Sequence, residues 1–229
     1  MLHSIEDVQH VFHDDVNLEF LESFSLGVAW EYHRLYEELK ADNRLPDELK
    51  NFEFSRRRSG CAVRAIVQAA KKHDVPVLHW TLGCNGQQKL LIKMGRVLLI
   101  PEAISELMHR PAASNYKVAL ANTFGISRQL ELDLGDRRHR VTDWSGEVLG
   151  VLLHGAAGER FTRRDKMLGG LMLAIPDDLY QGWIARFDLH QLAMFGSRSS
   201  EFSGTQVAQQ RDEVIVIRKR KAKIIGNLK

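Results

Sequence analysis

Cysteine is scarce in this sequence, which has only Cys61 and Cys84 among its 229 residues. Two cysteines are too few for the disulfide framework of a small secreted domain or for the ligand set of a structural zinc site. A chain of this length also buries a sizeable core without cross-links. We therefore expect both thiols to be reduced and buried.

Long hydrophobic runs and targeting signals are missing as well. No run approaches the roughly 20 apolar residues that cross a bilayer. The first seven residues, MLHSIED, lack the basic and apolar regions of a signal peptide. We expect a soluble, cytoplasmic protein that has no contact with a membrane.

Motifs specific enough to name a reaction are also lacking, but three short apolar runs stand close together at 148–153, 171–175 and 183–187. Gly or Pro lies beside the first two runs, and turn-type residues separate all three. Short apolar runs bounded in this way are typical of buried strands rather than helices. The sequence therefore predicts that these runs form the centre of one sheet.

Helical spacing of apolar residues precedes that sheet. Residues 5–50 read as one long helix or as two helices broken near Gly27, ending around Pro46. Further elements are expected as a helix at about 59–73, a strand at 75–82, a hairpin at 89–100 that bends at Met94 and Gly95, and a short helix that begins at Pro101. The predicted fold class is α+β, with an N-terminal helical segment packed on a mixed, mainly antiparallel sheet.

Charge is distributed unevenly along the chain. Residues 1–50 hold four basic and twelve acidic side chains, a net charge of −8, whereas residues 51–229 carry +11 and bring the total to +3. We interpret this as an acidic helical arm at 1–50 and a basic α+β domain at 51–229. The arm is expected to dock on the basic body or on a protein partner.

The basic side chains form several clusters that suit a phosphate backbone. Arg56, Arg57 and Arg58 directly precede the helix expected at 59–73, where arginine opposes the helix dipole unless an anion lies nearby. The complete set of expected nucleic-acid contacts is Arg56, Arg57, Arg58, Lys71, Lys72, Lys89, Lys93, Arg96, Arg218, Lys219, Arg220 and Lys221. We therefore expect a nucleic-acid-binding or nucleoprotein-assembly protein that needs no cofactor and no metal.

Residues 120–128, LANTFGISR, resemble the first helix and turn of a helix-turn-helix DNA reader. The resemblance covers these nine residues only. The following segment alternates with period two, from Gln129 to Asp136, as a strand entering a hairpin does. The alternative is a helix that Gly125 terminates before such a strand.

Two enzyme classes are the alternatives to nucleic-acid binding. His154, Tyr180 and Glu213 come from three predicted strand regions and resemble the NAD-binding cleft of ADP-ribosyltransferases, although Ala156 replaces the threonine of the family's His-Gly-Thr pattern. That resemblance implies that the glutamate stabilises a cationic transition state. A metal-dependent nuclease is the second alternative, because Glu131 and Asp133 share one face of a predicted strand.

Those two carboxylates also have a purely structural interpretation. Arg138 and Arg140 follow them on the same predicted hairpin and are expected to pair with them across the strands. His154, Tyr180 and Glu213 likewise suit a core histidine, a turn tyrosine and a surface glutamate. Neither enzyme class is preferred to nucleic-acid binding.

Overall fold

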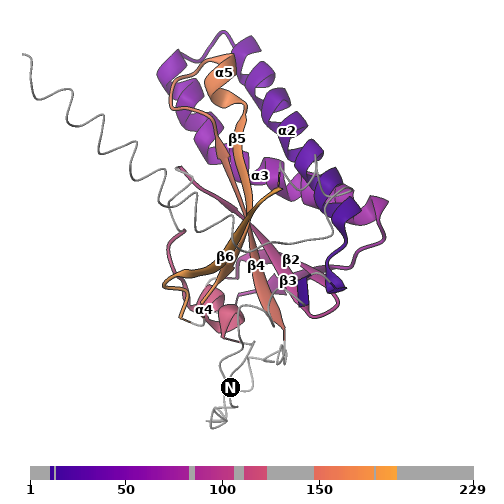
Figure 1. The fold of residues 1–229 in the computed structure, drawn as a ribbon. Helices are drawn as coiled ribbons and strands as arrows, with labels where there is room; N and C mark the ends of the chain where they lie inside the picture. The colour runs from indigo at the N-terminus through magenta and orange to yellow at the C-terminus, as the bar shows by residue number, and fades with distance from the viewer. Residues whose placement is uncertain are drawn as a thin grey trace, which may run out of the picture.

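The computed structural model describes residues 11–12, 14–82, 86–105, 111–122, 147–177 and 179–189. Within these ranges, two long helices pack on one face of a sheet, and a short helix covers part of the other face (Figure 1). This arrangement confirms the predicted α+β class.

The sheet has six strands within the described residues, in the order β1-β2-β3-β4-β5-β6. They are β1 (Val77–Thr81), β2 (Gln88–Met94), β3 (Val97–Ala103), β4 (Val148–Ala156), β5 (Leu168–Pro176) and β6 (Trp183–Asp188). Neighbouring strands run antiparallel except β3 and β4, which are parallel. The three apolar runs are thus confirmed as adjacent strands of one sheet. Strands β4 and β5 lie inside it, whereas β6 is at its edge within the described residues, so the prediction that all three runs form the centre was wrong for β6.

Two long helices form an antiparallel hairpin, α2 (Leu18–Ala41) and α3 (Asp47–Lys72). The Asn17 side chain accepts a hydrogen bond from the Phe20 backbone N–H and so caps the start of α2. Helix α2 continues without interruption through Gly27, where an added Cβ would lie 3.2 Å from Cβ of Ala65. Glycine at this position therefore allows close packing of the two helices.

Buried residues form a hydrophobic layer on each face of the sheet. On β4, Val148 and Leu152 face the helical hairpin, while Leu149, Val151 and Leu153 face helix α4 (Asn115–Ala121). Because both faces of β4 are covered, this strand is apolar along nearly its whole length. That is why the sequence shows a continuous apolar run there rather than an alternating one.

Helix α3 begins twelve residues before the predicted start at Ser59, so that prediction was wrong. Pro46 precedes the helix, and Asp47 and Glu48 occupy its first turn, where acidic side chains favour the helix dipole. The segment Arg56–Arg58 therefore lies inside the helix. The expected conflict between these arginines and a helix start does not arise.

A second correction concerns Pro101, which lies within β3 and does not begin a helix. Proline lacks a backbone N–H and cannot donate a hydrogen bond to a neighbouring strand. Pro101 is in register with Leu152 of the parallel strand β4, and in a parallel pair not every residue has to donate, so proline is tolerated here. Helix α3 also includes positions 50 and 51. The division of the chain there into an acidic arm and a basic domain stays a prediction.

The hairpin at 89–100 is confirmed by β2 and β3, which pair antiparallel around Gly95. Gly95 has a positive φ of 51°, and an added Cβ would lie 2.6 Å from Cγ of Asp15. Asp15 accepts hydrogen bonds from the backbone N and Nε of Arg96, so the N-terminal segment is fastened to this turn. Of the helices in the described residues, none combines the length and the apolar character needed to span a bilayer.

Candidate nucleic-acid interface

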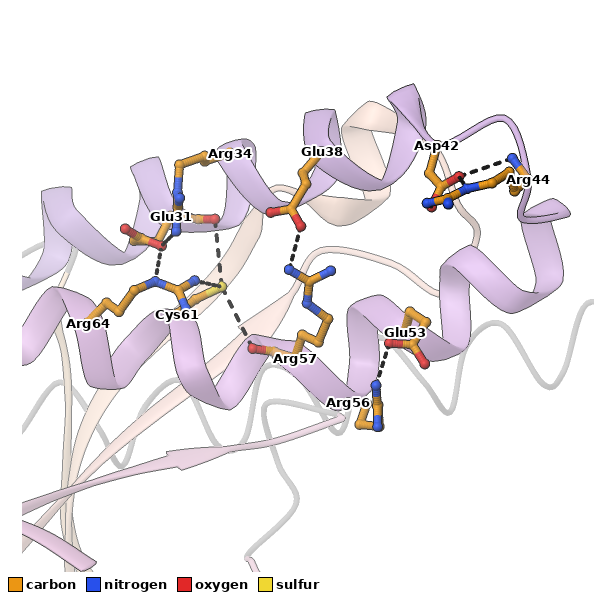
Figure 2. Close-up of polar contacts among 10 residues, drawn as sticks. All are labelled: Glu31, Arg34, Glu38, Asp42, Arg44, Glu53, Arg56, Arg57, Cys61 and Arg64. Atoms are coloured by element: carbon orange, nitrogen blue, oxygen red, sulfur yellow. Dashed lines mark hydrogen bonds and ion pairs between the residues drawn. The ribbon is translucent and has the colours of Figure 1, made fainter.

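The acidic helix α2 lies along the basic helix α3, and two sets of ion pairs join them (Figure 2). Oε1 of Glu38 lies 2.5 Å from Nη2 of Arg57. Closer to the middle of the hairpin, the buried carboxylate of Glu31 accepts from Arg34 and Arg64, each at 2.8 Å. Helix α2 therefore folds back on α3 and neutralises part of its charge.

The thiol of Cys61 is buried beside this network and is not part of a disulfide. It lies 3.7 Å from the carbonyl oxygen of Glu31, toward which its S–H can donate. Burial raises the pKa of the Cys61 thiol. The thiol is therefore reduced and buried as expected; Cys84 lies outside the described residues.

A shallow hollow of about 660 Å³ lies where the hairpin turns from α2 to α3. Its charged lining consists of Glu38, Asp42, Arg44, Glu53, Arg56 and Arg57. Arg56 pairs with Glu53 at 2.8 Å and Arg44 with Asp42 at 3.0 Å, as Figure 2 shows. Three arginines are thus concentrated at one end of the molecule, each beside a carboxylate.

The connection between β4 and β5 brings further arginines to the same end. Its short helix α5 (Arg163–Lys166) contacts α2 near the hairpin turn, as Figure 1 shows. Two cation–ring contacts fix it: Nζ of Lys50 lies 6.0 Å from the Phe161 ring, and Nζ of Lys166 lies 5.5 Å from the Phe54 ring. Residues more than 100 positions apart therefore meet at this end.

Arg160, Arg163 and Arg164 on this connection are exposed, and none of them makes an ion pair within the described residues. They were not among the predicted contacts. Their signal in the sequence is the group of three arginines within five residues, placed between two strand-like runs. We refer to the ends of α2 and α3 at the hairpin turn, together with residues 157–167, as the basic end.

Arg58 differs from its two neighbours because it faces the sheet and is half-buried. Its Nε is buried and has no hydrogen-bond partner among the described residues. Its positive charge lowers the pKa of Lys166, although burial of that ammonium is the larger cause. Arg58 therefore adds positive potential beneath the basic end but is not an exposed contact.

The other predicted basic contacts lie elsewhere. Lys71 and Lys72 end α3, and at 1.5 Å per residue they are roughly 22 Å along the helix from Arg57. Lys89 is on the opposite face of the sheet, with Nζ 5.2 Å from the Tyr116 ring of α4. The structure does not bring these lysines to the arginines of α3.

Lys93 and Arg96 each form an ion pair with a carboxylate of the same chain. Lys93 shares the α4 face with Leu91 and pairs with Glu147. Arg96 binds Asp15 at 2.7 Å, and the hydrogen bond from its guanidinium is the main reason that the pKa of Asp15 is lowered. Both side chains therefore fasten segments of the fold together.

His154 and Tyr180, two of the three transferase candidates, lie on opposite faces of the sheet. Nδ1 of His154 lies 2.7 Å from the hydroxyl of Tyr32 on α2, whereas Tyr180 packs with Trp183 on the α4 face. Burial lowers the pKa of His154 to about 3, and Arg58 contributes to the same shift. The structure does not bring His154 and Tyr180 together into one cleft.

Several predicted features lie outside the described residues: Glu131, Asp133, Glu213, Arg218, Lys219, Arg220 and Lys221. Only residues 120–122 of the helix-turn-helix-like pattern are described, at the end of α4. Within the described ranges, no group of three histidine, cysteine or acidic side chains is arranged to hold a metal ion.

Comparison with known proteins gave no match to a protein-family model, to a curated protein or to a solved structure.

Proposed function

We propose that this protein binds the phosphate backbone of nucleic acid through its basic end, with Arg56, Arg57, Arg160, Arg163 and Arg164 as the contacts. The observation that carries the proposal is the convergence of two arginine groups, one on α3 and one on the β4–β5 connection. Arginine suits this role because its planar guanidinium binds phosphate oxygens in a bidentate manner.

The intramolecular ion pairs of Arg56 and Arg57 are compatible with this role. The side chains of both arginines are well exposed, at 66% and 40% of their maximal area. Exposed ion pairs of this kind contribute about 0–1 kcal/mol, so a polyanion can displace the carboxylate at little cost. Arg163 and Arg164 offer their guanidinium groups without such a competitor in the described part of the chain.

Contacts to phosphate alone make binding sensitive to salt and insensitive to base sequence. If all five arginines contact phosphates, log K against log salt concentration has a slope of roughly −4.5 on duplex DNA and roughly −3.5 on single strands. The proposal therefore predicts binding to both kinds of oligonucleotide, with a steep loss as salt rises.

The test is a fluorescence anisotropy titration of the whole protein with labelled single- and double-stranded oligonucleotides at low salt. Arg163→Ala with Arg164→Ala should weaken binding several-fold on every sequence. The matched control, Lys72→Ala with Lys89→Ala, removes the same two charges away from the basic end and should leave the affinity almost unchanged. Equal losses in the two double variants would show that net charge alone attracts the oligonucleotide, and the proposal would fail.

A further inference from the structure

Large apolar side chains are exposed on the outer face of the helical hairpin, which points away from the sheet. On α2, Leu26 and Trp30 are 65% and 57% exposed; on α3, Val63 and Val67 are 37% and 38% exposed. Each pair is four residues apart, so each forms one apolar stripe along its helix. We call these four side chains the outer patch.

The two stripes lie at the same height along the hairpin. Glu31 pairs with Arg64, and Gly27 packs against Ala65, which fixes how the helices are aligned. Trp30 is therefore level with the α3 segment that contains Val63, and Leu26 with the segment that contains Val67. The outer patch occupies the middle of the hairpin on both helices.

Charge differs between the two helices beside this patch. The exposed residues Glu19 and Glu22 make the first turns of α2 acidic. Helix α3 has no acidic residue after Glu53 and ends at the exposed Lys71 and at Lys72. Where α2 begins and α3 ends, the hairpin is thus acidic on one helix and basic on the other.

We propose that the outer patch binds the outer patch of a second copy of this chain, with α2 of each protomer on α3 of its partner. A two-fold axis parallel to the helices produces this arrangement, because it exchanges the two helices while keeping their height. Leu26 and Trp30 then meet Val63 and Val67, and Glu22 lies near Lys71 of the other copy.

Charge complementarity selects this arrangement over the other face-to-face dimer. A two-fold axis perpendicular to the helices would place α2 on α2 and α3 on α3, each antiparallel to its copy, and would bring Lys71 and Lys72 of one copy toward the α3 segment of the other that holds Arg56 and Arg57. Like charges opposed in this way are unfavourable. The pairing of α2 with α3 instead opposes unlike charges.

The composition and size of the face suit a dimer. Trp30 carries Arg34 over its ring at 5.5 Å, and tryptophan and arginine are the residues most often found at the energetic centre of interfaces. The 24 residues of α2 extend about 36 Å. Two such helices side by side provide an area of the order that a specific dimer buries.

The test is sedimentation equilibrium of the full chain without nucleic acid, so that its outcome is independent of the proposed function. The wild-type protein should dimerise with a Kd below about 100 µM, and Trp30→Ser should raise that Kd at least tenfold. Leu179→Ser, which changes a side chain that is 59% exposed on the β5–β6 connection, serves as the control and should leave the Kd unchanged.

A charge exchange tests how the two copies are arranged. Glu22→Lys and Lys71→Glu should each raise the Kd by up to about thirtyfold, because each substitution breaks two symmetry-related exposed ion pairs that are worth up to about fivefold each. The double variant should return to within about twofold of the wild type, because the opposed charges are then complementary again. A wild-type monomer across this concentration range, or a dimer unaffected by Trp30→Ser, overturns the proposal; a charge exchange without rescue overturns the pairing of α2 with α3.

Discussion

Tyr32 and His154, which are 122 positions apart, are joined by a buried hydrogen bond of 2.7 Å between the helical hairpin and the centre of the sheet. The Tyr32 ring also packs edge-on against Phe54 of α3. These contacts hold both helices over β4. They also place an ionisable imidazole where charging it is costly, because His154 is only 1% exposed.

The protein should lose stability as pH falls from about 6.5 toward 3. Burial, with a contribution from Arg58, holds the pKa of His154 at about 3 in the folded state, against 6.5 for the unperturbed side chain. The unfolded chain therefore binds the proton first, and folding is penalised increasingly between these two values. At 1.36 kcal/mol per pKa unit, the upper bound of the loss is roughly 5 kcal/mol.

Urea unfolding at pH 7 and pH 4 measures this effect. His154→Leu should reduce the difference in unfolding free energy between the two pH values, even though the variant is less stable at pH 7. His79 is exposed on β1, so His79→Gln is the matched control and should leave the difference intact. An equal pH dependence in the wild type and in His154→Leu would argue against the depressed pKa.

Removing the carboxylate of Glu31 should destabilise the fold more than removing that of Glu38. Glu31 is 1% exposed and serves two arginines, whereas the Glu38 side chain is 50% exposed and serves Arg57 alone. We expect Glu31→Ala to cost about 1–3 kcal/mol, since Arg34 and Arg64 can still reach solvent. Glu38→Ala should cost less than about 1 kcal/mol. Thermal unfolding compares the two variants, and similar losses would contradict the importance of the buried site.

Alanine at Gly95 should be more destabilising than alanine at Gly86. Both glycines have positive φ, 51° and 68°, so both substitutions introduce backbone strain. Only Gly95 also faces Asp15, at 2.6 Å from the position of an added Cβ, while nothing lies within 4 Å at Gly86. The difference in unfolding free energy between the two variants therefore measures how firmly the N-terminal segment is fastened to the β2–β3 turn. A zero difference would mean that Asp15 moves aside freely.

Most strands of the sheet could be predicted from the sequence because the signals for them are local. The runs that became β4, β5 and β6 are short, apolar and bounded by turn residues, and the Met94–Gly95 turn identifies a hairpin without any tertiary information. The start of α3 was misplaced because polar and charged side chains interrupt the apolar stripe before residue 59. The cap-type signal at Pro46 and the acidic first turn were the better guides.

The candidate site was less predictable, because it depends on which distant segments meet. Arg56 and Arg57 could be identified as a cluster, but nothing local indicates that Glu38 lies beside Arg57. Side chains alternate between the two faces of β2, and Lys89 lies on the face that α4 covers, away from the arginines. The sequence alone does not tell which of the two faces the helical hairpin covers. Arg163 and Arg164 lie at the basic end because Phe161 and Lys166 contact the two long helices, and these long-range contacts have no local signal in the sequence.

The most direct test of phosphate binding at the basic end is the salt dependence of oligonucleotide affinity. Anisotropy titrations on one duplex across a range of salt concentrations give the slope of log K against log salt for the wild type and for Arg163→Ala with Arg164→Ala. The account predicts that the double variant flattens this slope by about 2, one for each lost phosphate contact. A slope that is the same in both proteins, or no measurable binding by the wild type at low salt, would contradict it.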